Sequence, residues 1–187
     1  MKGYKNKLRL IILFIAILIA IIFVLDNAAM LLYPVKYHDL VQLYSEKFNL
    51  DPYLVLSIIK AESNFKPDAV SPKNARGLMQ ISEKTGKWGA EKLKLMDYTK
   101  EDLFDPETNI YIGCWYLSVL YSEFSDMDIV LAAYNGGSGN VAQWLKDSTL
   151  STNGKSLDRI PFKETEKYLK KVKNSYRIYK KLYESKF

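Results

Sequence analysis

The sequence predicts a mainly α-helical domain preceded by one N-terminal transmembrane helix. Two segments begin with the same pair of residues, at Asp51-Pro52 and at Asp105-Pro106. Aspartate is a favourable N-cap and proline is tolerated at the first helical position, so each pair marks the start of a helix. No alternating apolar and polar pattern of any length is present, which argues against an extended sheet. The third observation is an unbroken apolar run near the N-terminus.

That apolar run extends from Leu10 to Leu25 and follows a basic segment, residues 1–9. Its sixteen residues span about 24 Å as a helix, a little less than a hydrocarbon core of about 30 Å, so flanking residues must contribute. Residues 10–33 are therefore predicted to be a transmembrane signal-anchor. A cleaved signal peptide, with a weak small-residue site around Ala28-Ala29, is the alternative. Lysines before the helix place residues 1–9 in the cytoplasm and residues 34–187 outside the membrane.

The rest of the chain is divided into elements by apolar periodicity, capping residues, prolines and glycines. In order, we expect a helix over 37–48, a helix from 52 that ends before Pro67, a loop over 68–76, a helix that begins near 77–80, a helix from 106 toward 124, a helix opened by Asp126 and stopped by Gly136-Gly137, a short helix over 141–145, a loop over 147–155 and a closing helix over 164–183. The closing helix carries one apolar stripe, formed by Tyr168, Val172, Tyr176, Tyr179 and Tyr183.

Composition limits the chemistry that the chain can perform. The 187 residues suffice for one domain plus an attachment segment. The single cysteine, Cys114, cannot form an internal disulfide and is expected to be buried. The single histidine, His38, excludes a multi-histidine metal site, and no metal or cofactor is predicted.

Glu62 is the candidate catalytic residue. Leu54, Ile58 and Glu62 recur every four residues, so this carboxylate lies on an otherwise aliphatic helix face. Apolar surroundings disfavour a charged carboxylate and raise its pKa, which suits a general acid. Alternatively, Glu62 faces water at the end of its helix and pairs with Lys66.

Five blocks of sequence carry a resemblance to a known family. They are Ala61-Glu62-Ser63-Asn64-Phe65, Gly77-Leu78-Met79-Gln80, Asp105 to Ile110 with Gly113 and Trp115 to Leu117, Ala133 to Gly137, and Ile160 to Phe162 with Glu164, Thr165 and Tyr168. In order and spacing the chain from about Tyr37 to its end resembles the soluble-lytic-transglycosylase-type catalytic domain of membrane-anchored lytic transglycosylases, in the goose-type lysozyme-like superfamily. The resemblance implies a lysozyme-like fold, with at most a small β element.

The resemblance also implies a reaction. Glu62 would protonate the oxygen between N-acetylmuramic acid and N-acetylglucosamine of peptidoglycan. The resulting carboxylate would accept the proton of the muramoyl 6-hydroxyl, which closes a 1,6-anhydro ring. A second catalytic carboxylate, usual in glycoside hydrolysis, is then unnecessary. A hydrolytic muramidase is a close variant, and a catalytically idle peptidoglycan-binding or scaffold protein of an envelope machine is the alternative.

Supporting roles follow from the same resemblance. Met79 would form an apolar wall of the cleft, and Gln80 would bind sugar hydroxyl or acetamido groups. Tyr134 and Asn135 would orient Glu62 or the substrate, although Tyr134 could equally be a core aromatic residue. Three further residues are expected to bind substrate, namely Ser63, Glu164 and Tyr168. Ser63 could instead bond back to its own helix, and Glu164 could complement a helix dipole.

The predicted partners are peptidoglycan glycan strands and, through the N-terminal helix, the membrane. The segment Lys163 to Lys186 holds nine Lys or Arg and three Glu. A solvated helix face explains this charge, and contact with anionic lipid or a wall polymer is the alternative. Nucleic acid is not expected, because the chain reads as exported and no nucleic-acid motif accompanies the charge.

Overall fold

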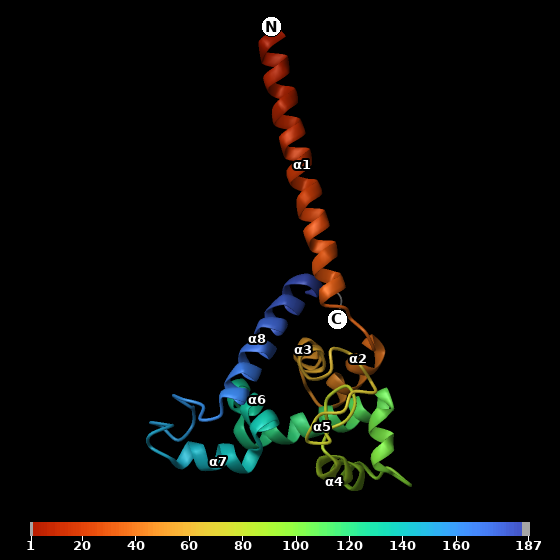
Figure 1. Cartoon of the computed structure of the whole chain (residues 1–187), viewed down its shortest axis with the longest axis vertical. Coiled ribbons are helices and arrows are strands. Elements are labelled where there is room, and N and C mark those ends of the chain that lie inside the picture. Colours follow the sequence, from red (N-terminus) through yellow and green to blue (C-terminus); the bar gives the residue numbers. More distant parts are fainter. Residues whose placement is uncertain (1, 185–187) are drawn as a thin grey trace. The chain divides into compact units, whose positions relative to one another are not determined.

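The structure is a computed structural model that describes residues 2–184. The chain divides into two compact units, Met1–Pro34 and Val35–Phe187. The first unit is the single helix α1 (Lys2–Leu32), drawn in red to orange in Figure 1. Within it, Arg9–Leu32 is long and apolar enough to cross a membrane, and its most apolar 18 residues have a mean hydropathy of 3.0.

The second unit is built from helices, which confirms the predicted mainly α fold class. Its elements are α2 (His38–Lys47), α3 (Pro52–Glu62), α4 (Glu83–Leu93), the short 3₁₀ helix η1 (Lys100–Phe104), α5 (Pro106–Phe124), α6 (Met127–Gly136), α7 (Ser138–Lys146) and α8 (Lys163–Tyr183). Extended pairing within residues 2–184 is limited to two isolated antiparallel bridges, which join Arg76 to Val70 and to Ile81.

The predicted helix starts at aspartates are confirmed. The Asp51 carboxylate accepts a hydrogen bond from the Tyr53 N–H at 2.8 Å, and Pro52 is the first residue of α3. Asp105 caps α5 in the same way. Asp126 accepts from two N–H groups at the start of α6. These bonds satisfy donors that a helix N-terminus otherwise leaves unpaired.

The prediction of a helix that begins near residues 77–80 is wrong, because this segment is a turn. Gly77 has a φ of +75°, and a Cβ there would lie 2.1 Å from the Leu103 carbonyl oxygen. The helix begins only at Glu83, where the Ser82 hydroxyl caps it. Sequence reasoning also missed η1, and it made α7 shorter than the observed Ser138–Lys146.

The side-chain amide of Asn109 holds this turn against α5. Asn109 is fully buried, and its Oδ1 accepts from the Met79 N–H at 2.7 Å. Its Nδ2 donates to the carbonyl oxygens of Arg76, at 2.9 Å, and Leu103, at 2.7 Å. One side chain thus satisfies three backbone groups, two from the 76–80 segment and one from η1, which a buried turn requires.

Helix α3 is the centre of the core. It packs against α8 on one side and α2 on the other, as Figure 1 shows. Every residue from Tyr53 to Ile59 is buried. The predicted stripe of α8 covers it, and of that stripe only Tyr176 is partly exposed. Cys114 is buried, as expected.

Candidate active site

A cavity of about 410 Å³ lies at the C-terminal end of α3. Its lining comes from α3, the loop after it, the 77–80 turn, the end of α6 and the start of α8. The lining residues are Glu62, Ser71, Pro72, Lys73, Ala75, Gln80, Tyr134, Asn135 and Glu164. A second cavity of about 290 Å³ is also lined by Gln80, Tyr134 and Asn135, and it has Tyr116 in its own wall.

Glu62 is the last residue of α3 and is half-buried. Burial raises the pKa of its carboxyl group from 4.5 to about 7, against the opposing effects of the Tyr168 hydroxyl and the Lys171 ammonium group. No ion pair joins Glu62 to Lys66 or to any other cation that the structure describes. The carboxyl group therefore exchanges its proton near neutral pH, as an acid that also serves as a base must.

Two tyrosine hydroxyls lie in the electrostatic field of this carboxylate. The Tyr168 hydroxyl is buried, and within residues 2–184 no partner meets full hydrogen-bonding geometry. Burial and the Glu62 charge raise the pKa of Tyr168 well above its usual value, so the phenol keeps its proton and stabilises the carboxylate. The Tyr134 hydroxyl donates to the Met79 carbonyl oxygen at 2.8 Å, and its pKa is raised in the same way.

The Met79 side chain does not form the expected apolar wall. It is fully buried, and it packs so closely on Gly113 that a Cβ on that glycine would lie 2.3 Å from the Met79 Sδ. Met79 contributes its backbone instead, bonded to Asn109 and to Tyr134. The polar groups of the turn that reach the cavity belong to Gln80.

Gln80 and Ser63 are both fixed by backbone carbonyls. The Gln80 amide nitrogen donates to Ala69 at 3.0 Å and to Gly77 at 2.9 Å, which leaves its amide oxygen to accept from a ligand. The Ser63 hydroxyl is buried, 2.8 Å from the Leu78 carbonyl oxygen and 3.2 Å from that of Ile59. Ser63 therefore ties α3 to the turn and to its own helix, which was the alternative interpretation of this residue.

Asn135 and Glu164 complete the predicted set. The Asn135 Oδ1 accepts from the Thr165 hydroxyl at 2.9 Å, which joins α6 to α8 beside the cavity. Glu164 is largely exposed and lies 3.5 Å from the Lys73 ammonium group. The cavity thus brings together five predicted residues, Glu62, Gln80, Tyr134, Asn135 and Glu164. Of the other three, Tyr168 acts on Glu62, whereas the side chains of Ser63 and Met79 are buried away from it.

Sequence reasoning missed Lys171. Its ammonium group donates to the Ala61 carbonyl oxygen at 2.5 Å, next to Glu62, and its charge lowers the pKa of Glu62. The available signal was its position one helical turn after Tyr168 on α8. Among the residues that the structure describes, no group of three or more His, Cys, Asp or Glu is placed to hold a metal ion.

Comparisons with known proteins give a consistent result. The transglycosylase SLT domain family matches residues 39–155. The soluble lytic murein transglycosylase of Escherichia coli K12 is 36% identical over 143 residues, which cover 75% of this chain and 22% of that protein. The membrane-bound lytic murein transglycosylase C of Edwardsiella ictaluri is 32% identical over 180 residues, which cover 79% of this chain and 47% of that protein. The chain thus spans less than half the length of either relative.

Solved structures show the same likeness. The 70 kDa soluble lytic transglycosylase of E. coli superposes with a TM-score of 0.70 at 33% identity, over 80% of this chain and 25% of that one. An inactive Glu-to-Gln mutant of the lytic transglycosylase Slt from Pseudomonas aeruginosa superposes with a TM-score of 0.69 at 29% identity, over 80% of this chain and 24% of that one.

Proposed function

This chain belongs to the transglycosylase SLT domain family, and we propose that it is a lytic transglycosylase. Its substrate would be the β-1,4 bond between N-acetylmuramic acid and N-acetylglucosamine in peptidoglycan, and its products would carry 1,6-anhydro ends. The observation that carries this proposal is the half-buried Glu62 in a cavity, with a pKa of about 7.

Glu62 would act twice in one turnover. Protonated Glu62 donates its proton to the glycosidic oxygen as the bond to C1 of the muramoyl residue breaks. The Glu62 carboxylate then takes the proton of the muramoyl 6-hydroxyl while O6 forms its bond to C1. Glu62 gives one proton and takes one back, so no water is consumed and Glu62 returns to its protonated form.

The surroundings of Glu62 favour this use of one carboxyl group. The other carboxylate in the cavity, Glu164, is largely exposed and neighbours Lys73, so it lacks the environment of a second catalytic acid. In the intermediate stage, the Tyr168 hydroxyl and the Lys171 ammonium group stabilise the Glu62 carboxylate. The free amide oxygen of Gln80 and the Asn135 amide line the cavity, where they would bind sugar hydroxyl or acetamido groups.

The test is to digest purified peptidoglycan with the full chain in mild detergent and to weigh the released muropeptides. Anhydro ends, which are about one water lighter than reducing ends, are expected. Glu62→Gln should abolish release while the protein stays folded and still binds glycan, and it is the type of substitution carried by the inactive Slt mutant from P. aeruginosa. Reducing ends would show a muramidase, and binding without cleavage by the unaltered chain would show a scaffold. Release by the Glu62→Gln variant at the original rate would exclude Glu62 as the acid.

We also propose that α1 anchors the protein in the cell membrane as a single pass, with the N-terminus in the cytoplasm and the catalytic unit outside. The apolar stretch Arg9–Leu32 and the membrane-bound relative support membrane attachment, and the lysines before the stretch favour a cytoplasmic N-terminus. Protease added to cells stripped of their wall should degrade the catalytic unit, and the mass of the isolated protein should include residues 1–33. A mature protein that begins near Ala29 would show a cleaved signal peptide instead.

A further inference from the structure

The outward face of α8 is strongly basic. Its inward stripe, Tyr168, Val172, Tyr179 and Tyr183, is buried against the core. On the opposite side of the helix, four exposed cations fall on one stripe. They are separated by four, ten and four residues, which correspond to about one, three and one helical turns. We call these four residues the basic face: Lys163, Lys167, Arg177 and Lys181.

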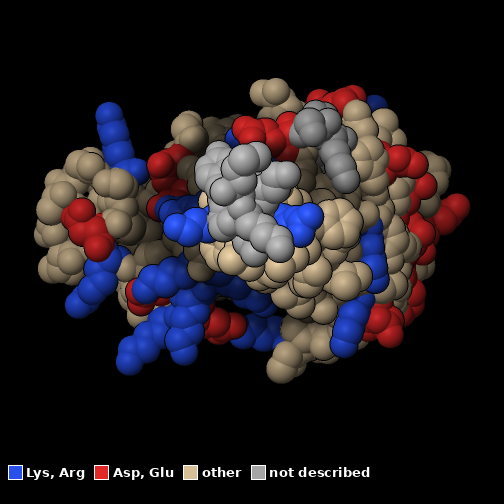
Figure 2. Space-filling view, turned by 90° about the horizontal axis from the view of Figure 1, so that it is seen from above, with Lys and Arg blue, Asp and Glu red and all other residues tan. Residues whose placement is uncertain are grey.

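The basic face is not neutralised by ion pairs. Three other lysines of α8 do have acidic partners, since Lys170 pairs with Glu166, Lys173 with Asp128 and Lys180 with Asp51. None of the four residues of the basic face makes an ion pair with any part of the chain from 2 to 184. Figure 2 shows Lys and Arg side chains gathered along one margin of the molecule, whereas Asp and Glu predominate toward the opposite one.

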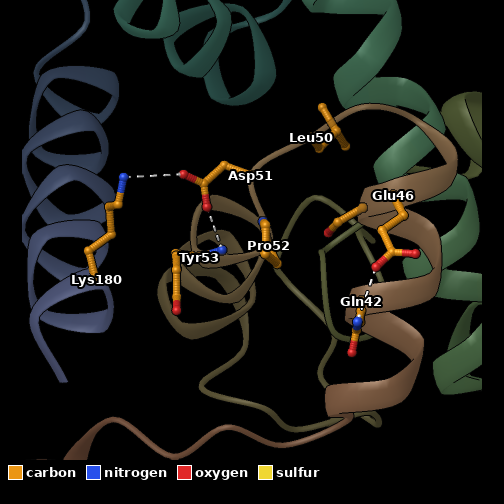
Figure 3. A pocket seen from close by; sticks show the side chains of 8 residues that line it. Gln42, Glu46, Leu50, Asp51, Pro52, Tyr53 and Lys180 are labelled. Atoms are coloured by element: carbon orange, nitrogen blue, oxygen red, sulfur yellow. Dashed lines mark hydrogen bonds and ion pairs between the residues drawn. The ribbon is translucent and has the colours of Figure 1, made fainter. Parts of the chain in front are cut away.

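In the second unit, the C-terminal end of α8 lies beside α2. This unit begins at Val35 and its first helix is α2, which starts at His38. Gln42 and Glu46 of α2 and Lys180 of α8 line one cavity of about 350 Å³. Figure 3 shows Lys180 directed from α8 toward Asp51, with Gln42 and Glu46 across the cavity. The five residues between α1 and α2 reach at most about 18 Å, so they form a short connection.

We infer that the basic face of α8 docks on the anionic phospholipid headgroups of the membrane that holds α1. This inference rests on the proposed membrane anchoring but not on the catalytic proposal. Each Lys or Arg at an anionic membrane surface increases binding about fivefold, and a short tether supplies a high effective concentration of lipid. Glu164, which lines the catalytic cavity, lies next to Lys163 at the start of the same helix. Docking therefore fixes the height and orientation of the cavity above the bilayer.

The experiment places a fluorophore on α8 and a quencher in the lipid. Asn174→Cys puts a single reactive thiol on the exposed side of α8, because the native Cys114 is fully buried. The full chain is reconstituted into vesicles of phosphatidylcholine alone or with about 30% phosphatidylglycerol, both with a nitroxide on a fraction of the headgroups. We expect quenching at least about twofold stronger in the anionic vesicles, and we expect 0.5 M salt to remove the difference, because such salt shortens the Debye length to about 4 Å.

A matched pair of variants tests whether the basic face is responsible. Replacing Lys163, Lys167, Arg177 and Lys181 by Gln should reduce the ratio of docked to undocked protein more than about tenfold. Replacing four exposed lysines elsewhere, Lys84, Lys87, Lys92 and Lys100, by Gln removes the same charge and should leave the quenching unchanged. Tryptophan emission checks that both variants are folded.

The outcomes separate the two proposals. A chain that fails to float with either kind of vesicle overturns the anchoring. A chain that floats but shows equal quenching in both lipids overturns the docking alone, and so does unchanged quenching in the variant without the basic face. A label that responds only when isolated anionic wall polymer is added assigns the face to that polymer and overturns the membrane contact.

Discussion

Glu62→Gln should make the stability of the second unit less dependent on pH. In the unfolded chain the Glu62 carboxyl group has its ordinary pKa of 4.5, whereas in the folded protein burial raises it to about 7. Between these values the unfolded state releases a proton that the folded state keeps, so stability falls as pH rises. The loss is 1.36 kcal/mol per pH unit, or about 3 kcal/mol in all, and it is complete above pH 7.

The measurement compares the free energy of unfolding of the two proteins between pH 4.5 and 8.5. Urea unfolding of the full chain in mild detergent, followed by tryptophan fluorescence, reports on the second unit because every tryptophan lies there. These residues are Trp88, Trp115 and Trp144. The free energy of the Glu62→Gln variant minus that of the unaltered protein should rise by about 3 kcal/mol from pH 4.5 to 7 and then stay level.

Comparison of the two proteins cancels the titration of all other groups, provided that the glutamine introduced by the substitution keeps the surroundings of Glu62. A difference that stays constant across the whole pH range would refute the raised pKa and with it the role of Glu62 as a proton donor near neutrality. A difference that rises only below pH 5 would show a folded-state pKa of no more than about 5, too low for a proton donor near neutrality.

Three further substitutions test parts of the site separately. Asn109→Ala leaves three buried backbone groups unpaired and should lower the free energy of unfolding by about 3–5 kcal/mol in the same urea assay. A loss below about 1 kcal/mol would contradict the bridging role of Asn109. Gly113→Ala forces Met79 to move and should lower the free energy of unfolding by about 1–3 kcal/mol. An unchanged urea midpoint would refute the tight packing of Met79 on Gly113. Lys171→Met removes a cation that lowers the pKa of Glu62, so the decline of the cleavage rate at alkaline pH should shift to higher pH. A decline at the same pH as in the unaltered protein would show that Lys171 does not influence Glu62.

Each substitution has a control that repeats the chemical change at an exposed position. Asn174→Ala truncates an asparagine on the outer side of α8. Gly139→Ala adds a methyl group where no atom lies within 4 Å of the new Cβ. Lys170→Met removes a cation that pairs with Glu166 on the surface. The urea midpoints of the first two controls and the pH profile of the third should match those of the unaltered protein.

Local signals in the sequence were sufficient for the helix starts at Asp51, Asp105 and Asp126 and for the position of Glu62 on an aliphatic face of α3. A cap followed by a proline acts within one turn, and a carboxylate on an aliphatic face is visible from spacing alone, so neither prediction needed the fold. The turn at residues 77–80 shows where this reasoning fails. Leu78, Met79 and Gln80 are good helix formers, but the Met79 N–H is bound by Asn109 from α5, and Gly77 holds a positive φ. Tertiary contacts override the local preference.

The same limit applies to side-chain direction at the site. Whether Met79 faced the cleft or the core depended on the space beside Gly113, and whether Ser63 bonded to a ligand or to the protein depended on the position of the Leu78 carbonyl. Both neighbours are distant in sequence, and no local pattern encodes them. The substrate-binding roles of Gln80 and Asn135 stay predictions, since contact with sugar is a property of the complex.

Three helices converge on the backbone of the 77–80 turn, and their hydrogen bonds link the buried Met79 to the cavity beside Glu62. Asn109 of α5 binds the Met79 N–H, Tyr134 of α6 binds the Met79 carbonyl, and Ser63 at the end of α3 binds the carbonyl before it. The turn therefore fixes the distance between Glu62 and the opposite wall, and it holds Gln80 at the cavity. A smaller residue at position 79 would leave the lining chemically unchanged but loosen the anchor of Tyr134. Such a substitution should consequently lower the rate of cleavage more than it lowers the affinity for glycan.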